Sequence, residues 1–126
     1  MQAAGQMILV VEDEPPMLDL LKEILENGGY RVLTAKDEIE AVEIYSRHQK
    51  ELALVLCDMA LPELGAYRVF LSLKESNPQV KLILTSQHLD PKVKSDMVKE
   101  GIKDFITKPY NPEIILKSTR EALESA

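Results

Sequence analysis

A chain of 126 residues with 45% hydrophobic and 29% charged side chains has the length and composition of one ordinary globular domain. A net charge of -6 with no basic run excludes direct nucleic-acid binding as the expected function, because a phosphate backbone attracts basic surface. The single cysteine excludes an internal disulfide framework, and no apolar stretch approaches the roughly 18 residues of a membrane span. We therefore expect a cytoplasmic protein.

Residues 1–6 lack the charged-then-apolar pattern of a signal peptide. We expect them to form a flexible lead to one domain that covers residues 7–126. Within that domain, segments with a strand pattern alternate with segments with a helix pattern, five of each.

The first strand is predicted over residues 7–11. The helix after it opens at Pro15-Pro16, where a missing amide donor is tolerated, and ends at Gly28-Gly29. Its predicted buried face follows the helical period and consists of Met17, Leu20, Leu21, Ile24 and Leu25. The second strand covers residues 31–35, and Asp37 begins the second helix. The side chains predicted to face inward from that helix are Ala41, Val42 and Tyr45.

The third strand is predicted over residues 52–57, and Asn77-Pro78 breaks the helix that follows it. The inward side chains of this third helix are Ala66, Val69, Phe70 and Leu73. The fourth strand covers residues 80–85. Asp90-Pro91 begins a fourth helix that ends near Gly101 and has a thin apolar face, mainly Val93 and Met97.

The fifth strand is predicted over residues 103–107, and Asn111-Pro112 begins the last helix. The inward side chains of this helix are Ile115, Leu116, Thr119, Ala122 and Leu123. Strict alternation of strands and helices predicts an α/β fold in which helices cover both faces of a parallel sheet.

The composition of the strands predicts their order in the sheet. The first and third strands are apolar throughout, as strands buried on both faces are, whereas the second and fifth carry charged residues that suit the edges. These compositions favour the order 2-1-3-4-5, the flavodoxin-like doubly wound arrangement. Strands one and three are then neighbours at the switch point, and ligands bind there, outside the carboxyl ends of the strands.

Polar side chains stand at or directly after the carboxyl ends of four predicted strands. They are Asp13 with its neighbour Glu12, Asp58, Thr85 and Lys108. Taken singly, each has an ordinary interpretation, such as an acid at the start of a helix or a turn residue. In a parallel sheet they meet at one edge, where three carboxylates repel one another unless a cation lies among them. Mg²⁺ fits such a place because it prefers oxygen ligands and binds one or two carboxylates together with phosphate oxygens.

An aspartate at a strand end, beside a metal ion and an ammonium group, can attack phosphorus and form an aspartyl phosphate. We assign that role to Asp58. The metal ion and Lys108 would neutralise charge on the transferring oxygens, and Thr85 would donate its hydroxyl proton to one of them. The sequence contains no glycine-rich nucleotide loop, zinc cluster or serine elbow that would indicate different chemistry.

Four motifs resemble the receiver domain of two-component response regulators. They are ILVVEDE at residues 8–14, VLCDMALP at 55–62, LILTS at 82–86 and DFITKP at 104–109. The resemblance extends over nearly the whole chain, from about Met7 to Leu123. It implies a bacterial signalling domain and not a classical enzyme, with self-catalysed phosphoryl transfer and slow hydrolysis at Asp58 as its only chemistry.

The resemblance implies that Asp58 accepts a phosphoryl group from the phosphohistidine of a histidine kinase or phosphotransfer domain. Glu12, Asp13, Asp58 and the backbone carbonyl of Ala60 would bind Mg²⁺. Thr85 and Lys108 would contact the phosphoryl group.

The resemblance also implies a cis peptide bond between Lys108 and Pro109, and a switch that involves Thr85 and Phe105. Phosphorylation would draw Thr85 inward and let Phe105 fill the vacated space, which is a population shift between two states of one surface. That surface is formed by the fourth helix, the fifth strand and the last helix, and an output domain or partner protein would bind there.

Several alternatives remain open from the sequence. The chain is a receiver that works alone or in a larger regulator, or the receiver from the carboxyl end of a hybrid histidine kinase, which residues 29–35, Asn77-Pro78 and residues 108–110 resemble. A pseudo-receiver that binds a partner without phosphorylation is disfavoured, because no acceptor or metal residue is missing. A flavin-binding electron carrier of similar fold would need a phosphate-cradling loop after the first strand, where this chain has acidic residues 12–14.

Overall fold

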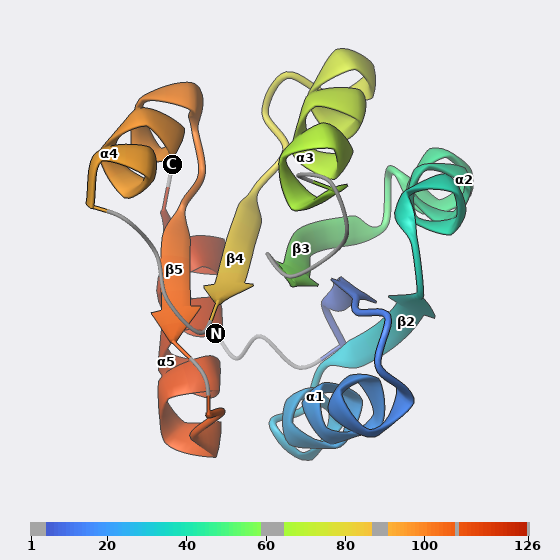
Figure 1. Cartoon of the computed structure of the whole chain (residues 1–126). Helices are drawn as coiled ribbons and strands as arrows, with labels where there is room; N and C mark the ends of the chain where they lie inside the picture. Colours follow the sequence, from blue (N-terminus) through green and yellow to red (C-terminus); the bar gives the residue numbers. More distant parts are fainter. Residues whose placement is uncertain (1–4, 59–64, 87–90, 108, 126) are drawn as a thin grey trace.

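The computed structural model describes residues 5–58, 65–86, 91–107 and 109–125, and within these ranges strands and helices alternate as predicted (Figure 1). The strands are β1 (Met7–Val11), β2 (Arg31–Ala35), β3 (Leu52–Asp58), β4 (Leu82–Ser86) and β5 (Asp104–Thr107). The helices are α1 (Pro15–Asn27), α2 (Glu38–His48), α3 (Gly65–Ser76), α4 (Pro91–Glu100) and α5 (Pro112–Glu124). The described helices all fall short of the length and apolar character that crossing a bilayer requires.

The strands form one parallel sheet in the order β2-β1-β3-β4-β5, which confirms the predicted flavodoxin-like arrangement. Every residue of β1 is buried, whereas β2 begins with the exposed Arg31 and β5 ends with the exposed Thr107. The charged strands therefore lie at the edges, because a strand covered on both faces by helices has no solvated position for a charge.

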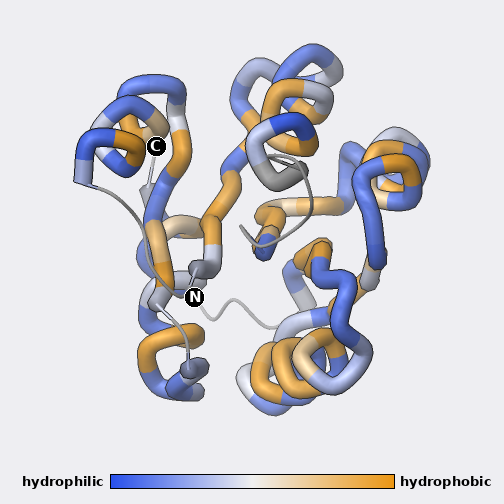
Figure 2. Tube along the Cα trace, viewed as in Figure 1, coloured by the Kyte–Doolittle hydropathy of each residue, from blue (hydrophilic) through white to orange (hydrophobic). Residues whose placement is uncertain are grey.

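Helices cover both faces of the sheet, with α1 and α5 on one face and α2, α3 and α4 on the other (Figure 1). Alternate residues of β1 point to opposite faces. Ile8 and Val10 belong to the core under α1 and α5, and Leu9 and Val11 belong to the core on the other side. Hydrophobic residues accordingly run along the central strands and in stripes on the helices (Figure 2).

Local signals set several helix ends. The side chain of Asp37 accepts a hydrogen bond from the Glu40 amide at 2.8 Å, and that of Asn111 accepts one from the Glu113 amide at 2.9 Å. Each satisfies an amide that has no partner inside its helix, which confirms the predicted starts of α2 and α5. After α1, Gly29 has a φ of 96°, a conformation that side chains with a Cβ rarely adopt.

Several details of the predicted elements were wrong; β3 and β4, for example, each end one residue later than predicted, at Asp58 and Ser86. β4 begins at Leu82 and not at residue 80, because the amide of the buried Val80 donates to the Asn77 carbonyl in the turn after α3. β5 begins at Asp104, one residue later than predicted. In α4, Met97 is buried as predicted, but Val93 is 38% exposed.

Some predictions concern residues that the structure does not describe. Asp90, the predicted start of α4, lies outside the described residues, as do residues 1–4 of the predicted lead. The side chain of Ala66 likewise belongs to the part that is not described.

Candidate functional site

Carboxylates from two neighbouring strands meet at the carboxyl edge of the sheet. Glu12 and Asp13 directly follow β1, and Asp58 is the last residue of β3. One carboxylate oxygen from each of the three residues lies within 4.8 Å of those of the other two. The Glu12 and Asp58 side chains are buried, whereas Asp13 is exposed and opens the cluster to solvent. The structure therefore brings together the three acidic residues that were predicted to lie at this edge.

The register of the sheet explains this proximity. Val11 pairs with Cys57 across β1 and β3, so Glu12 and Asp58 follow at the same level. The Glu12 amide donates to the Ala35 carbonyl of β2 at 3.0 Å, so the hydrogen bonding between β1 and β2 continues one residue past the end of β1. The Glu12 carboxylate in turn accepts a hydrogen bond from the Glu14 amide at 3.2 Å. Backbone pairing thus holds Glu12 in place at the start of the loop that leads to α1.

Thr85 adds a hydroxyl to the same site. It pairs with Asp58 across β3 and β4, and its side chain is fully buried. Its Oγ1 lies 3.5 Å from Asp58 Oδ1, at the long end of hydrogen-bonding distance. The predicted convergence of Asp58 and Thr85 is therefore present in the structure.

Tyr110 reaches the site from the segment after β5, although no sequence pattern predicted this residue at the acidic cluster. Its hydroxyl lies 3.0 Å from Thr85 Oγ1 and 3.4 Å from Glu12 Oε1, within hydrogen-bonding distance of both. Burial raises the pKa of this hydroxyl, the Thr85 hydrogen bond opposes the rise, and the charges of Glu12 and Asp58 add to it. The signal for Tyr110 was its position two residues past Lys108, at the edge where the other polar residues gather.

The described residues give the site a negative electrostatic character. Burial raises the pKa of the Cys57 thiol, and the neighbouring carboxylates of Asp58 and Glu12 raise it further. Three carboxylates this close repel one another strongly in a partly buried place, and a hard cation with oxygen ligands would relieve that repulsion. The donor set therefore fits a Mg²⁺-type ion.

The comparisons with known proteins identify the family. A family model described as the response regulator receiver domain matches residues 8–120. The chain belongs to the response regulator receiver family. The chemotaxis protein CheY of Bacillus subtilis is 30% identical to it over 117 residues, which cover 92% of this chain and 96% of that protein.

Solved structures agree with this family. A response regulator receiver domain protein from Clostridium thermocellum is 27% identical, covers 93% of both chains and has a TM-score of 0.86. The CheX–CheY–BeF3–Mg complex from Borrelia burgdorferi has a TM-score of 0.90 at 23% identity and covers 97% of this chain and 92% of that one. The latter supports the receiver fold alone.

Three predicted features of this receiver domain lie outside the described residues: the Lys108 side chain, the Ala60 carbonyl and the peptide bond that joins Lys108 to Pro109. Phe105, the predicted switch residue, lies in β5 opposite Leu84 and is half-buried. The Lys94 ammonium of α4 lies 5.6 Å from the centroid of the Phe105 ring, within the range of a cation–π contact. Phe105 therefore connects β5 to α4.

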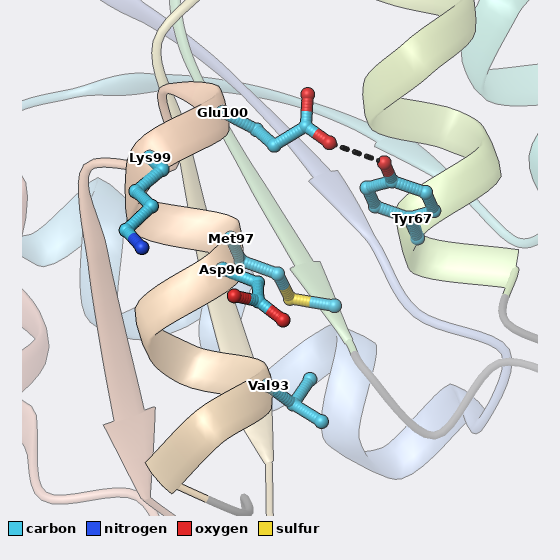
Figure 3. Close-up of a pocket in the computed structure, with 6 residues that line it drawn as sticks. All are labelled: Tyr67, Val93, Asp96, Met97, Lys99 and Glu100. Atoms are coloured by element: carbon cyan, nitrogen blue, oxygen red, sulfur yellow. Dashed lines mark hydrogen bonds between the residues drawn. The ribbon is translucent and has the colours of Figure 1, made fainter.

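A pocket of about 600 Å³ lies between α3 and α4 of this receiver domain, and it shares no residue with the acidic cluster (Figure 3). Its lining consists of Tyr67, Val93, Asp96, Met97, Lys99 and Glu100. The Tyr67 hydroxyl donates to Glu100 Oε2 at 2.6 Å and so links α3 to α4 beside the pocket (Figure 3). Val93 borders this open space, which explains why it is more exposed than its helical position predicts.

Proposed function

We propose that this receiver domain is the phosphoacceptor of a two-component system and that Asp58 is the acceptor. The donor is the phosphohistidine of a histidine kinase or a phosphotransfer domain. The observation that carries this proposal is the position of the Asp58 carboxylate, which lies within 4.8 Å of Glu12 and Asp13 and within hydrogen-bonding distance of Thr85. The proposed place of action is the bacterial cytoplasm, as for the family.

Mg²⁺ is the proposed cofactor. The carboxylates of Glu12, Asp13 and Asp58 would hold it together with the backbone carbonyl of Ala60, and the three carboxylates fit because all offer hard oxygen ligands at one point. When bound, the ion supplies positive charge that offsets the charge of the phosphoryl oxygens.

The residues of the chain have distinct proposed roles in the transfer. A carboxylate oxygen of Asp58 attacks phosphorus, the bond between phosphorus and the donor's imidazole nitrogen breaks, and its electron pair returns to that nitrogen. The Thr85 hydroxyl donates to one phosphoryl oxygen, and the Lys108 ammonium pairs with another. Slow hydrolysis of the aspartyl phosphate is the only further reaction proposed.

The proposed output is a change of the surface that α4, β5 and α5 form. Thr85 lies in β4 beside Asp58, and Phe105 lies on the neighbouring strand against Lys94 of α4. A movement of Thr85 toward the phosphoryl group would therefore reach α4 through Phe105. An output domain or partner protein would distinguish the two states by this surface, and direct contact with nucleic acid is not part of the proposal.

Labelling with acetyl phosphate tests this function. Wild-type protein in Mg²⁺ is expected to gain the mass of one phosphoryl group, and Asp58→Asn is expected to gain none. Asp19→Asn, an exposed aspartate on α1, is the matched control and should label as the wild type does. Removal of Mg²⁺ with a chelator should slow labelling strongly.

Two outcomes would contradict the proposal. Equal mass gain in Asp58→Asn would mean that the acceptor is a different residue. No gain in the wild type, with or without Mg²⁺, would favour a pseudo-receiver that binds its partner without phosphorylation.

A further inference from the structure

Tyr110 links three of the strands that build the site. Its hydroxyl lies 3.0 Å from Thr85 Oγ1 at the end of β4 and 3.4 Å from Glu12 Oε1 after β1, and Thr85 Oγ1 lies 3.5 Å from Asp58 Oδ1 at the end of β3. The result is a chain of oxygen contacts, Glu12–Tyr110–Thr85–Asp58, which we call the hydroxyl chain. A carboxylate stands at each end of it.

The hydroxyl chain has three oxygen contacts but only two hydroxyl protons. A charged carboxylate only accepts hydrogen bonds, so both protons come from Tyr110 and Thr85. The contact between these two hydroxyls is the shortest at 3.0 Å, against 3.4 Å to Glu12 and 3.5 Å to Asp58. If both protons pointed outward to the carboxylates, this shortest contact would have no proton. One of the two hydroxyls therefore donates to the other.

Both remaining arrangements hold the Thr85 hydroxyl close to Asp58 before a phosphoryl group is present. Either Tyr110 donates to Thr85, whose own proton then points to Asp58, or Thr85 donates to Tyr110, whose proton then points to Glu12. In the first arrangement the Thr85 proton already faces the acceptor carboxylate. In the second, the Thr85 oxygen is already 3.5 Å from Asp58, and its hydroxyl proton must rotate to face that carboxylate.

Tyr110 is itself held rigidly enough for this task. Its ring packs against the core that α1 and α5 cover, and the side chain is half-buried. A hydroxyl on an anchored ring can fix a neighbouring group at little cost in conformational entropy, since the ring is already ordered. A reacting group held by such a neighbour is placed before the substrate arrives, which lowers the barrier to reaction.

We propose that Tyr110 is a positioning residue for phosphoryl transfer, and that its hydroxyl holds the Thr85 hydroxyl toward Asp58. This inference rests on the proposed phosphoacceptor function and extends it to a residue that does not touch the phosphoryl group. Tyr110 acts mainly through Thr85 and only secondarily through Glu12, because its contact with Thr85 is the shorter one.

A double-mutant cycle tests the inference. Tyr110→Phe removes the hydroxyl and keeps the ring, so we expect it to lower the rate of labelling by acetyl phosphate about two- to tenfold at saturating Mg²⁺, the range that loss of one neutral hydrogen bond produces. In a Thr85→Ala background the same change should have almost no further effect. Tyr45→Phe is the matched control: the Tyr45 hydroxyl accepts from Asn77 at 3.0 Å, away from the acidic cluster, and its loss should leave the labelling rate unchanged.

The outcomes separate the two proposals. Wild-type protein that is not labelled at Asp58 overturns the phosphoacceptor function and this inference with it. Labelling of the wild type at Asp58 with an unchanged rate in Tyr110→Phe overturns the inference alone. So does a loss that persists in full in Thr85→Ala, or one that appears only below saturating Mg²⁺, since the latter means that Tyr110 acts through Glu12.

A spectroscopic measurement needs no Tyr110 variant. With tyrosine labelled with ¹³C at the ring carbon that bears the hydroxyl, Thr85→Ala should shift the NMR resonance of Tyr110 and leave that of Tyr45 in place. An unmoved Tyr110 resonance would contradict the hydroxyl chain.

Discussion

Replacing Asp58 by asparagine is expected to stabilise the metal-free protein. The change keeps the shape of the side chain and an oxygen that accepts the Thr85 hydrogen bond, but it removes one of three clustered carboxylates. At the 4.8 Å limit of their separation, two unit charges repel by about 3.5 kcal/mol at an effective dielectric constant near 20 and by about 0.9 kcal/mol in water.

The burial of the partners decides where in this range the effect falls. Glu12 is buried and Asp13 is exposed, so the repulsion between Asp58 and Glu12 is screened less than that between Asp58 and Asp13. We expect the free energy of unfolding to rise by about 1–3 kcal/mol in Asp58→Asn when no divalent cation is present.

Urea unfolding followed by circular dichroism, at neutral pH with a chelator, measures this change. Mg²⁺ should reverse the ranking, because a ligand at 1,000 times its dissociation constant stabilises the wild type by about 4.1 kcal/mol and should bind the variant much more weakly. Asp19→Asn, the exposed control, should stay within about 0.5 kcal/mol of wild type. A variant that is no more stable than wild type in chelator, or that gains as much from Mg²⁺, would refute the carboxylate cluster as a cation site.

Three further predictions follow from burial, pKa and backbone conformation. Cys57 is fully buried and its thiol pKa is raised, so a thiol reagent should react with it only after unfolding; equal rates in native and urea-unfolded protein would contradict this. All four tyrosines have a pKa above the ordinary 10.0, so near pH 10 the folded state keeps phenol protons that the unfolded state loses. The free energy of unfolding should therefore be highest below pH 10 and fall as the pH rises through the raised pKa values. An alkaline titration that records tyrosinate absorbance and circular dichroism together checks this, and tyrosines that ionise with an ordinary pKa of 10 in folded protein would contradict it. Gly101→Ala should lower the free energy of unfolding, measured by thermal unfolding, by about 1–3 kcal/mol, because Gly101 has a φ of +115°, which residues with a Cβ rarely adopt. The added Cβ itself would fit, since its nearest contact would be an ordinary 3.7 Å to Phe70. Unchanged stability would contradict the expected backbone strain.

The strand order could be predicted from the sequence because the burial of a strand determines which residue types it contains. A strand covered on both faces has no place for a charge, so Arg31 and Asp104 assigned their strands to the edges. Parallel pairing then brings strand ends together, and this is why Glu12 and Asp58 could be placed at one point from positions 46 residues apart, that is 58 minus 12.

The remaining details depend on packing that a local pattern does not contain. Val93 and Met97 share one helix face at a spacing of four residues, which predicts equal burial. Both line the space between α3 and α4, but Met97 also belongs to the hydrophobic core, whereas Val93 is 38% exposed. The sequence did not predict the place of Tyr110 for a similar reason. The path of the chain after β5 brings its hydroxyl to Thr85, and no hydrophobic periodicity indicates that path.

Peptide mapping of the phosphorylated protein shows directly whether Asp58 is the phosphoacceptor. After labelling with acetyl phosphate and Mg²⁺, proteolysis and mass spectrometry should find one phosphoryl group, and fragmentation should assign it to Asp58. A phosphoryl group on any other residue, or a labelled protein whose Asp58 is unmodified, would contradict the account.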